Sequence, residues 1–254
     1  NTSLTNLNCA INDLTSLDVI SNTALTELIC QGNQLTSLDV SSNTALTNLR
    51  CYSNNLTSLD VSNNTALTEM RCARNELTSL DVSSNTALTH LSCNDNQLTS
   101  LDVSSNTALT RLYCYTNQLD SLDVSSNTEL TKLICGNNSL ASLDLSNNAD
   151  LTELHLGVNQ LTSLDVSSNT ALTRLTCNSN QLTYLNMKNG VTDGLTHFNA
   201  TNNDSLECIE TLDTTYATVN WTYANGNIDE GVTFAADCIP FIGPVWHVST
   251  TGSD

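Results

Sequence analysis

Residues 25–45 read LTELICQGNQLTSLDVSSNTA, and the chain repeats this pattern every 21 residues. The unit has two similar halves, LTELICQGNQ and LTSLDVSSNTA, and the triplets LIC and LDV each place apolar residues on alternate positions. This alternation is the periodicity of a β-strand. No segment has a sustained apolar stripe at 3.6-residue spacing, so we expect no long helix. The Asn after each strand suits a tight corner, where its side chain can bond the backbone of the neighbouring turn.

The cysteines mark how far the period extends. Cysteine recurs at 21-residue intervals, and one further cysteine lies 42 residues on, with Leu156 in the skipped place: Cys9, Cys30, Cys51, Cys72, Cys93, Cys114, Cys135 and then Cys177. Nine units run from Leu4 to about Asn189, and a degenerate tenth begins at Leu195. A single unit cannot close a hydrophobic core, but stacked units can. The sequence therefore predicts a mainly β, parallel solenoid over residues 1–205, filled with Leu, Cys and Val.

The repeated motif L-x-x-L-x-C-x-x-N-x-L resembles bacterial leucine-rich repeats. The 21-residue form that carries cysteine is similar to repeats of the internalin J type and to those of secreted Bacteroidetes proteins. The resemblance covers about 205 of the 254 residues. It implies a parallel sheet on the concave side, with short strands or extended segments on the opposite side. It also implies a secreted or cell-surface protein used for recognition or adhesion.

The ten cysteines divide into two groups. The eight repeat cysteines would form a column in the core, and because the Cβ vectors of neighbouring parallel strands run side by side, packing of free thiols is favoured over disulfides. A metal or redox ladder is the alternative, but no His accompanies these residues at ligand spacing. Cys208 and Cys238 lie outside the period, and we predict that a disulfide between them staples a C-terminal cap, residues 206–239, over the last turn. A disulfide implies an oxidising, extracellular location.

The two ends of the chain suggest a module of a larger protein. The sequence starts at Asn1 inside a repeat, without Met or an apolar signal stretch, so we interpret it as a mature or trimmed fragment. Pro240 and Pro244 indicate a linker within residues 240–254. The residues after Pro244 resemble the opening strand of secreted parallel β-helix domains, and a packed tail is the alternative. No run of 18 apolar residues exists, so we expect no direct membrane insertion.

The charge and the missing motifs narrow the function. With 26 acidic and 7 basic residues the net charge is −19, which argues against general binding to nucleic acid. The chain has no G-x-S-x-G, H-E-x-x-H, P-loop or dinucleotide motif. His90, His155 and His197 fall in separate turns, and no nucleophile is placed beside them by spacing. We expect a monomeric, non-catalytic protein without a cofactor.

Comparison of the repeats with one another points to a binding face. Most positions barely change, but two outward positions on the first strand and two positions just beyond its Cys vary strongly. These four columns hold six of the seven basic residues and three of the six Tyr. Arg and Tyr supply much of the binding energy at interfaces. We therefore expect a protein or glycan ligand on the concave face, at Arg50, Tyr52, Arg71, Arg74, His90, Arg111, Tyr113, Tyr115, Lys132, His155 and Arg174.

An alternative for these columns is a solvated sheet face whose long side chains cover the backbone. At the level of the whole chain, the hypothesis is a recognition or adhesion module of an exported bacterial protein. Two other functions stay open, a structural spacer and the substrate-binding part of a larger secreted multidomain enzyme. Because charges further away than about 8 Å are screened at physiological salt, an anionic partner stays possible on this one face.

A column of Asp recurs on the second strand. It comprises Asp18, Asp39, Asp60, Asp81, Asp102, Asp123, Asp144 and Asp165. Stacked carboxylates repel each other by roughly 1 kcal/mol per pair, so they need hydrogen bonds or cations between turns. Hydrogen bonds are favoured over weak Ca²⁺ sites at Asp39, Asp60, Asp81, Asp102 and Asp123, because no second acidic column completes an oxygen cage. A recurring Thr, as at Thr26 and Thr47, is expected to bond backbone; a flat ice-binding hydroxyl array is the alternative.

Overall fold

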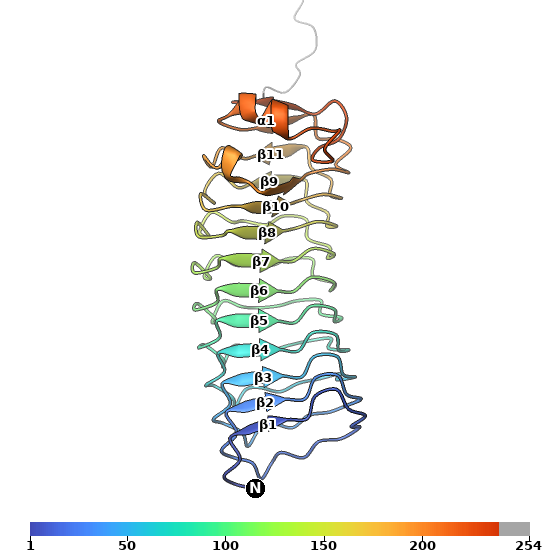
Figure 1. The fold of residues 1–254 in the computed structure, drawn as a ribbon, viewed down its shortest axis with the longest axis vertical. Coiled ribbons are helices and arrows are strands. Elements are labelled where there is room, and N and C mark those ends of the chain that lie inside the picture. The colour runs from blue at the N-terminus through green and yellow to red at the C-terminus, as the bar shows by residue number, and fades with distance from the viewer. Residues whose placement is uncertain (239–254) are drawn as a thin grey trace, which may run out of the picture.

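The computed structural model describes residues 1–238, and in it the chain winds into a stack of similar turns (Figure 1). One strand of each turn joins a ten-stranded parallel sheet, in which every strand pairs with the next turn's strand. Its strands, in order, are β1 (Asn6–Asn8), β2 (Glu27–Ile29), β3 (Asn48–Arg50), β4 (Glu69–Arg71), β5 (His90–Ser92), β6 (Arg111–Tyr113), β7 (Lys132–Ile134), β8 (Glu153–His155), β10 (Arg174–Thr176) and β12 (His197–Asn199). The mainly β, parallel solenoid predicted from the 21-residue period is confirmed.

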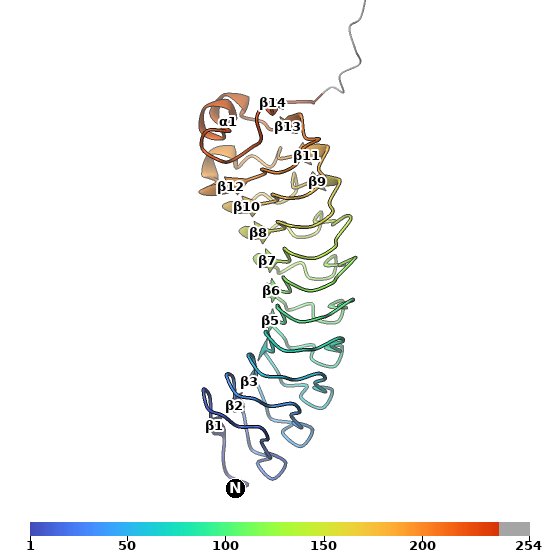
Figure 2. The ribbon, with the colours of Figure 1, turned by 90° about the vertical axis from the view of Figure 1, so that its right-hand side faces the viewer.

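The opposite side of the solenoid is mostly extended backbone. Only its C-terminal part forms a second parallel sheet, in the order β14-β13-β11-β9, from β9 (Ser163–Asp165), β11 (Tyr184–Asn186), β13 (Cys208–Glu210) and β14 (Thr233–Ala235). A 3₁₀ turn, η1 (Thr192–Gly194), lies where the tenth unit begins two residues late. Figure 2 shows the ten-stranded sheet on the concave side of a gently curved molecule, as the resemblance implies.

The core consists of columns of identical side chains. In one turn, Leu49, Cys51, Leu56 and Val61 have no exposed surface, and the same positions are buried in the turns on either side. Each buried aliphatic side chain contributes roughly 1.5–3 kcal/mol. The repeat cysteines are free thiols that pack as small apolar groups, and burial raises the pKa of Cys30 to about 12. Within residues 1–238, no cluster of three or more His, Cys, Asp or Glu could hold a metal ion.

Asparagine side chains bond adjacent turns together, as the sequence predicts for its corners. Asn75 Nδ2 donates to the carbonyls of Cys72 and Cys51, at 3.0 and 3.1 Å, and its Oδ1 accepts from Leu56 N at 3.0 Å. A second column repeats the principle on the other side of the turn, where Asn85 Nδ2 donates to Val61 O at 2.9 Å. The recurring Thr also bonds backbone, since each hydroxyl donates to the equivalent Thr carbonyl one turn earlier. Side-chain hydrogen bonds therefore join each turn to the backbone of the turn before it.

The C-terminal end is covered by a cap that includes α1 (Thr214–Asn220). Cys208 and Cys238 form a disulfide, and Asp213 caps α1 by accepting a hydrogen bond from Tyr216 N at 2.8 Å. Trp221 is 4% exposed and packs on Phe198 of the last turn, with ring centroids 4.5 Å apart. The cap does not interrupt the solenoid, because β13 pairs in parallel with β11.

Part of the predicted domain organisation lies beyond the residues that the structure describes. The linker and following strand predicted for residues 240–254 lie outside the described residues, as does Ile239. Within the described part, no helix has both the length and the apolar character needed to cross a membrane.

Candidate ligand-binding face

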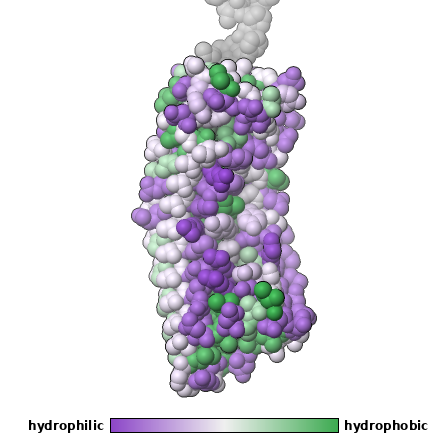
Figure 3. Space-filling model, viewed as in Figure 1, coloured by the Kyte–Doolittle hydropathy of each residue, from purple (hydrophilic) through white to green (hydrophobic). Residues whose placement is uncertain are grey.

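The outward side chains of the ten-stranded sheet form the candidate site. Each strand has three residues; in β3 to β8 the middle one is fully buried and the outer two lie on the concave face. Here the term concave patch denotes Arg50, Tyr52, Arg71, Arg74, His90, Arg111, Tyr113, Tyr115 and Lys132. Figure 3, seen from this side, shows strongly hydrophilic side chains along the middle of the face and an apolar area near the N-terminal strands.

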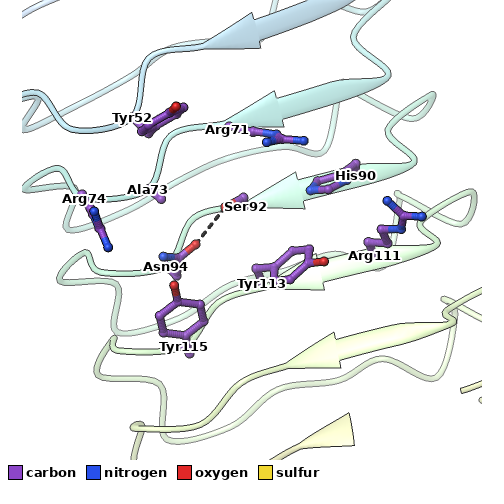
Figure 4. Close-up of a pocket in the computed structure, with 10 residues that line it drawn as sticks. All are labelled: Tyr52, Arg71, Ala73, Arg74, His90, Ser92, Asn94, Arg111, Tyr113 and Tyr115. Carbon is purple, nitrogen blue, oxygen red and sulfur yellow. Dashed lines mark hydrogen bonds between the residues drawn. The ribbon is translucent and has the colours of Figure 1, made fainter. Parts of the chain in front are cut away.

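The centre of the concave patch is a shallow pocket of about 370 Å³. Seven predicted residues line it together with three that the sequence did not single out: Tyr52, Arg71, Arg74, His90, Arg111, Tyr113 and Tyr115, with Ala73, Ser92 and Asn94. Figure 4 shows Arg71, His90, Arg111 and Tyr113 on the strands and the others on or next to the loops that follow them. The remaining predicted residues lie on the same sheet outside this pocket, Arg50 on β3, Lys132 on β7, His155 on β8 and Arg174 on β10.

An aromatic pair stands in the middle of the pocket. The rings of His90 and Tyr113 are stacked, with centroids 5.3 Å apart and planes 22° from parallel. Burial lowers the pKa of His90 below its ordinary value, Arg71 lowers it further, and Glu69 opposes them. The imidazole is therefore neutral at pH 7, and its ring nitrogens can act as donor and acceptor.

Ion pairs neutralise part of the positive charge on this face. Glu69 forms ion pairs with both Arg50 and Arg71, with N···O distances of 3.4 and 2.7 Å. Glu153 pairs with Lys132, and Arg74 lies 3.8 Å from Asp95 across the loops. Within residues 1–238, Arg111 and Arg174 make no ion pair.

A second polar cluster, which the sequence did not predict, surrounds His155. Thr176 Oγ1 lies 3.1 Å from His155 Nδ1, and Glu153 Oε1 lies 2.8 Å from Nε2. The sequence placed no hydroxyl beside this histidine, because the two residues are 21 positions apart and meet only through strand pairing. Burial lowers the pKa of His155, with Glu153 opposing. A neutral imidazole that donates from Nε2 and accepts at Nδ1 satisfies both contacts, and these bonds fix its orientation.

The loop after each strand contains a left-handed backbone position that sequence reasoning missed. The residue two places after the Cys position has φ between 53° and 61° in nine turns, at Ile11, Ser53, Arg74, Asp95, Thr116, Asn137, Val158, Ser179 and Asn202. Gly32 takes this place in the second turn with φ 66°. The signal was present in the sequence, since Gly and Asn favour this conformation. Arg74 is therefore presented to the pocket from a strained backbone.

Replacing Val158 with Asn is expected to raise the free energy of unfolding by about 0.5–1 kcal/mol. A β-branched residue is costly at the φ of 61° found there, whereas Asn tolerates it, as Asn137 does one turn earlier. Half of Val158 is exposed, so little packing is lost. Urea unfolding followed by circular dichroism measures the change. Val158→Ala, which removes the branch without gaining tolerance for positive φ, should not reach the same stability; equal effects of the two variants would contradict the backbone explanation.

Two glycines limit the concave patch on its C-terminal side. A Cβ on Gly136 would lie 2.7 Å from the carbonyl oxygen of Gly157, and one on Gly157 would lie 2.6 Å from Asn178 Oδ1. These positions correspond to Tyr52 and Tyr115 in earlier turns. At Gly136 the close contact is with the backbone of the next turn, whereas at Gly157 it is with the side chain of Asn178. Neither glycine adds a side chain to the loops, and the row of loop side chains that lines the pocket ends at Tyr115.

The Asp column lies on the side opposite the concave patch. Each Oδ1 accepts a hydrogen bond from the backbone N–H two residues later, for example Asp39 from Ser41 at 2.9 Å and Asp102 from Ser104 at 2.9 Å. Hydrogen bonds from the side chain and backbone of Ser41 hold the pKa of Asp39 below its ordinary value. These bonds are the ones that the sequence favoured. Weak Ca²⁺ binding to the column, the alternative that the sequence disfavoured, can be tested by calorimetric titration.

Comparison with known proteins agrees with the repeat pattern. A family model for leucine-rich repeats, two copies, matches residues 86–127. No curated protein sequence matches the chain. Solved structures of leucine-rich repeat proteins have the same fold. One of them, the leucine-rich repeat protein LIC12759 from Leptospira interrogans, is 22% identical to this chain, with a TM-score of 0.71 over 88% of this chain and 65% of that one. The chain is therefore built of leucine-rich repeats.

A more similar structure is the functional domain of InlJ from Listeria monocytogenes, which includes a cysteine ladder. It is 43% identical with a TM-score of 0.81, over 87% of this chain, and this chain spans about half, 48%, of that domain. The ectodomain of the plant receptor kinase GASSHO1/SCHENGEN3 from Arabidopsis thaliana, in complex with CASPARIAN STRIP INTEGRITY FACTOR 2, has the same fold at 22% identity and a TM-score of 0.65, over 76% of this chain and 25% of that one. Proteins with this fold are in general non-enzymatic modules that interact with proteins.

Proposed function

We propose that this chain is a non-catalytic recognition or adhesion module that binds a protein or glycan ligand through the concave patch. One observation carries the proposal. In a molecule of net charge −19, six of the seven basic residues lie in the variable columns of the first strand and its loop, and three of them line one pocket. A face that only covered backbone would have no need to concentrate Arg, Tyr and His over β4 to β6. The same asymmetry favours a binding function over a structural spacer.

We also propose that the protein is exported and acts as a monomer on or outside the cell surface. The disulfide between Cys208 and Cys238 supports export, because such bonds persist in oxidising compartments. The resemblance to repeats of the internalin J type supports the same location. No cofactor enters this proposal.

The proposal is tested by a double variant, Arg71→Ala with Tyr113→Ala, on protein and glycan arrays beside the wild type. A ligand held by the concave patch should bind the double variant about thirtyfold more weakly, since two interface residues of this kind together contribute about 2 kcal/mol or more. The matched control is Asp102→Ala with Ser121→Ala, on the opposite side of the solenoid, which should bind like the wild type. A confirmed ligand that binds both double variants equally well would exclude the concave patch.

A further inference from the structure

Around the pocket, cationic side chains outnumber carboxylates. Arg50, Arg71, Arg111 and Lys132 lie on β3, β4, β6 and β7, and the carboxylates paired with them are those of Glu69 and Glu153. Four cations against two carboxylates leave a local excess of positive charge. At physiological salt the screening length is about 8 Å, so a ligand in the pocket senses mainly this balance and not the net −19.

Arg111 is the cation at the centre of this excess. In the sheet it stands in register with His90 on one side and Lys132 on the other. Glu69 is occupied by Arg50 and Arg71, and Glu153 by Lys132, so Arg111 has no ion-pair partner within residues 1–238. Figure 4 shows its guanidinium beside His90, with Arg71 on the other side of the imidazole. Arg111 therefore lines the pocket with a guanidinium, which carries five N–H donors, that no carboxylate of the described residues engages.

Tyr113, at the centre of the pocket, offers its ring edge and its hydroxyl. One ring face of Tyr113 is covered by His90, with the centroids 5.3 Å apart, and the strand on its other side places Ile134 in register with it. A sugar stacks on an open ring face, whereas a phenol flanked in this way offers its hydroxyl and ring edge, which suit polypeptide groups. Figure 4 shows the Tyr113 hydroxyl directed toward the side of Arg111.

We propose that the pocket between Arg71 and Arg111 binds a carboxylate of an acidic segment of a protein ligand, with Arg111 as the principal charged contact. The inference rests on the proposed function, because it uses the same face, and it narrows the partner from protein or glycan to an acidic polypeptide. Guanidinium binds carboxylate in a bidentate manner, with stronger hydrogen bonds than neutral groups make. The Tyr113 hydroxyl and the Ser92–Asn94 pair, joined at 2.8 Å, supply neutral donors and acceptors for the peptide backbone beside that carboxylate.

The probe is a fluorescein-labelled hexaglutamate peptide, with hexaglutamine carrying the same label for comparison. Fluorescence anisotropy should show saturable binding of hexaglutamate to the wild type that weakens as NaCl is raised, and no binding of hexaglutamine. Arg111→Gln should weaken binding about tenfold, the effect of one charge-assisted hydrogen-bonded contact. Ser100→Glu changes the net charge by the same amount on the opposite side of the solenoid, and it should change affinity less than about twofold.

Several results would overturn the inference. The first is the absence of saturable hexaglutamate binding to the wild type. The second is an equal loss of hexaglutamate affinity in Arg111→Gln and Ser100→Glu. The third is tight binding of a sulfated oligosaccharide by wild-type protein that does not bind hexaglutamate. Failure here can be told apart from failure of the proposed function. A ligand from the arrays that loses binding to the Arg71→Ala, Tyr113→Ala variant but keeps full affinity for Arg111→Gln would retain the concave patch and refute the acidic-segment site. Both variants alter exposed or half-buried side chains, so circular dichroism should match the wild type.

Discussion

Replacing Asn75 with Ala is expected to lower the free energy of unfolding by about 3 kcal/mol. The side chain is 8% exposed, and its amide donates to the carbonyls of Cys51 and Cys72 while its Oδ1 accepts from Leu56 N–H. Alanine leaves a buried N–H and buried carbonyls without these partners, and each such group costs about 1–3 kcal/mol. Because the bonds link Asn75 and Cys72 of one turn to Cys51 and Leu56 of the turn before, the loss affects the interface between these two turns as well as the corner itself.

Urea unfolding followed by circular dichroism measures the loss. Asn55→Ala serves as a control, because this exposed Asn lies in the same loop one turn earlier and should cost less than about 0.5 kcal/mol. Asn75→Asp separates bonding from volume: it fills the same space but presents oxygen to two carbonyls, so it should be at least as destabilising as Ala. A small effect of both Asn75 variants would show that water replaces the bonds, and the asparagine column would then not hold the turns together.

Removing the disulfide is expected to cost about 3–4 kcal/mol. The bond closes a loop of 30 residues that contains α1 and Trp221, the side chain that covers Phe198 at the end of the core. Without it the unfolded chain gains loop entropy, and the cap opens at less cost than the repeats. Urea unfolding of the double variant Cys208→Ala, Cys238→Ala gives the difference, and hydrogen exchange should place it mainly in the C-terminal turns.

Reductant provides the matched control for this prediction. Dithiothreitol should destabilise the wild type by the same amount and leave the double variant unchanged, because the other eight cysteines are free thiols. A double variant that unfolds at the same urea concentration as the wild type would mean that aromatic packing alone closes the end of the solenoid.

The repeats were predictable because each position in them has one structural task. A 21-residue spacing of Cys, with Leu at fixed offsets and an invariant Asn, leaves few ways to bury all the apolar residues, and Leu156 shows that the place of the Cys requires only an apolar group. The contacts that close the cap were harder to predict from the sequence. Its closure depends on Trp221 meeting Phe198 and on Asp229, which accepts from the Asn202 and Asn203 amides where a further turn would begin. These contacts occur once, so no internal comparison could reveal them.

The face of the candidate site was predictable, but its internal contacts were not. Variation between repeats identified the columns that contain Arg71, Arg111 and Tyr113, since structural positions hardly vary. Which cations are paired depends on side-chain reach across strands, and sequence spacing does not specify this. Glu69 could pair with several neighbours, and only the structure shows that it holds Arg50 and Arg71 and leaves Arg111 without a partner among the described residues. The contact between Thr176 and His155 also forms across a strand pair.

The separation of the Asp column from the basic residues affects how the molecule is oriented when it approaches a charged surface. Eight Asp lie along one side and the Arg residues along the other, so the solenoid has an electric dipole across its width in addition to its net charge. Within a Debye length of a negatively charged surface, this dipole exerts a torque that turns the concave side toward the surface and the Asp column away from it. Encounters are therefore oriented before any contact forms, and raising the salt concentration removes this orientation.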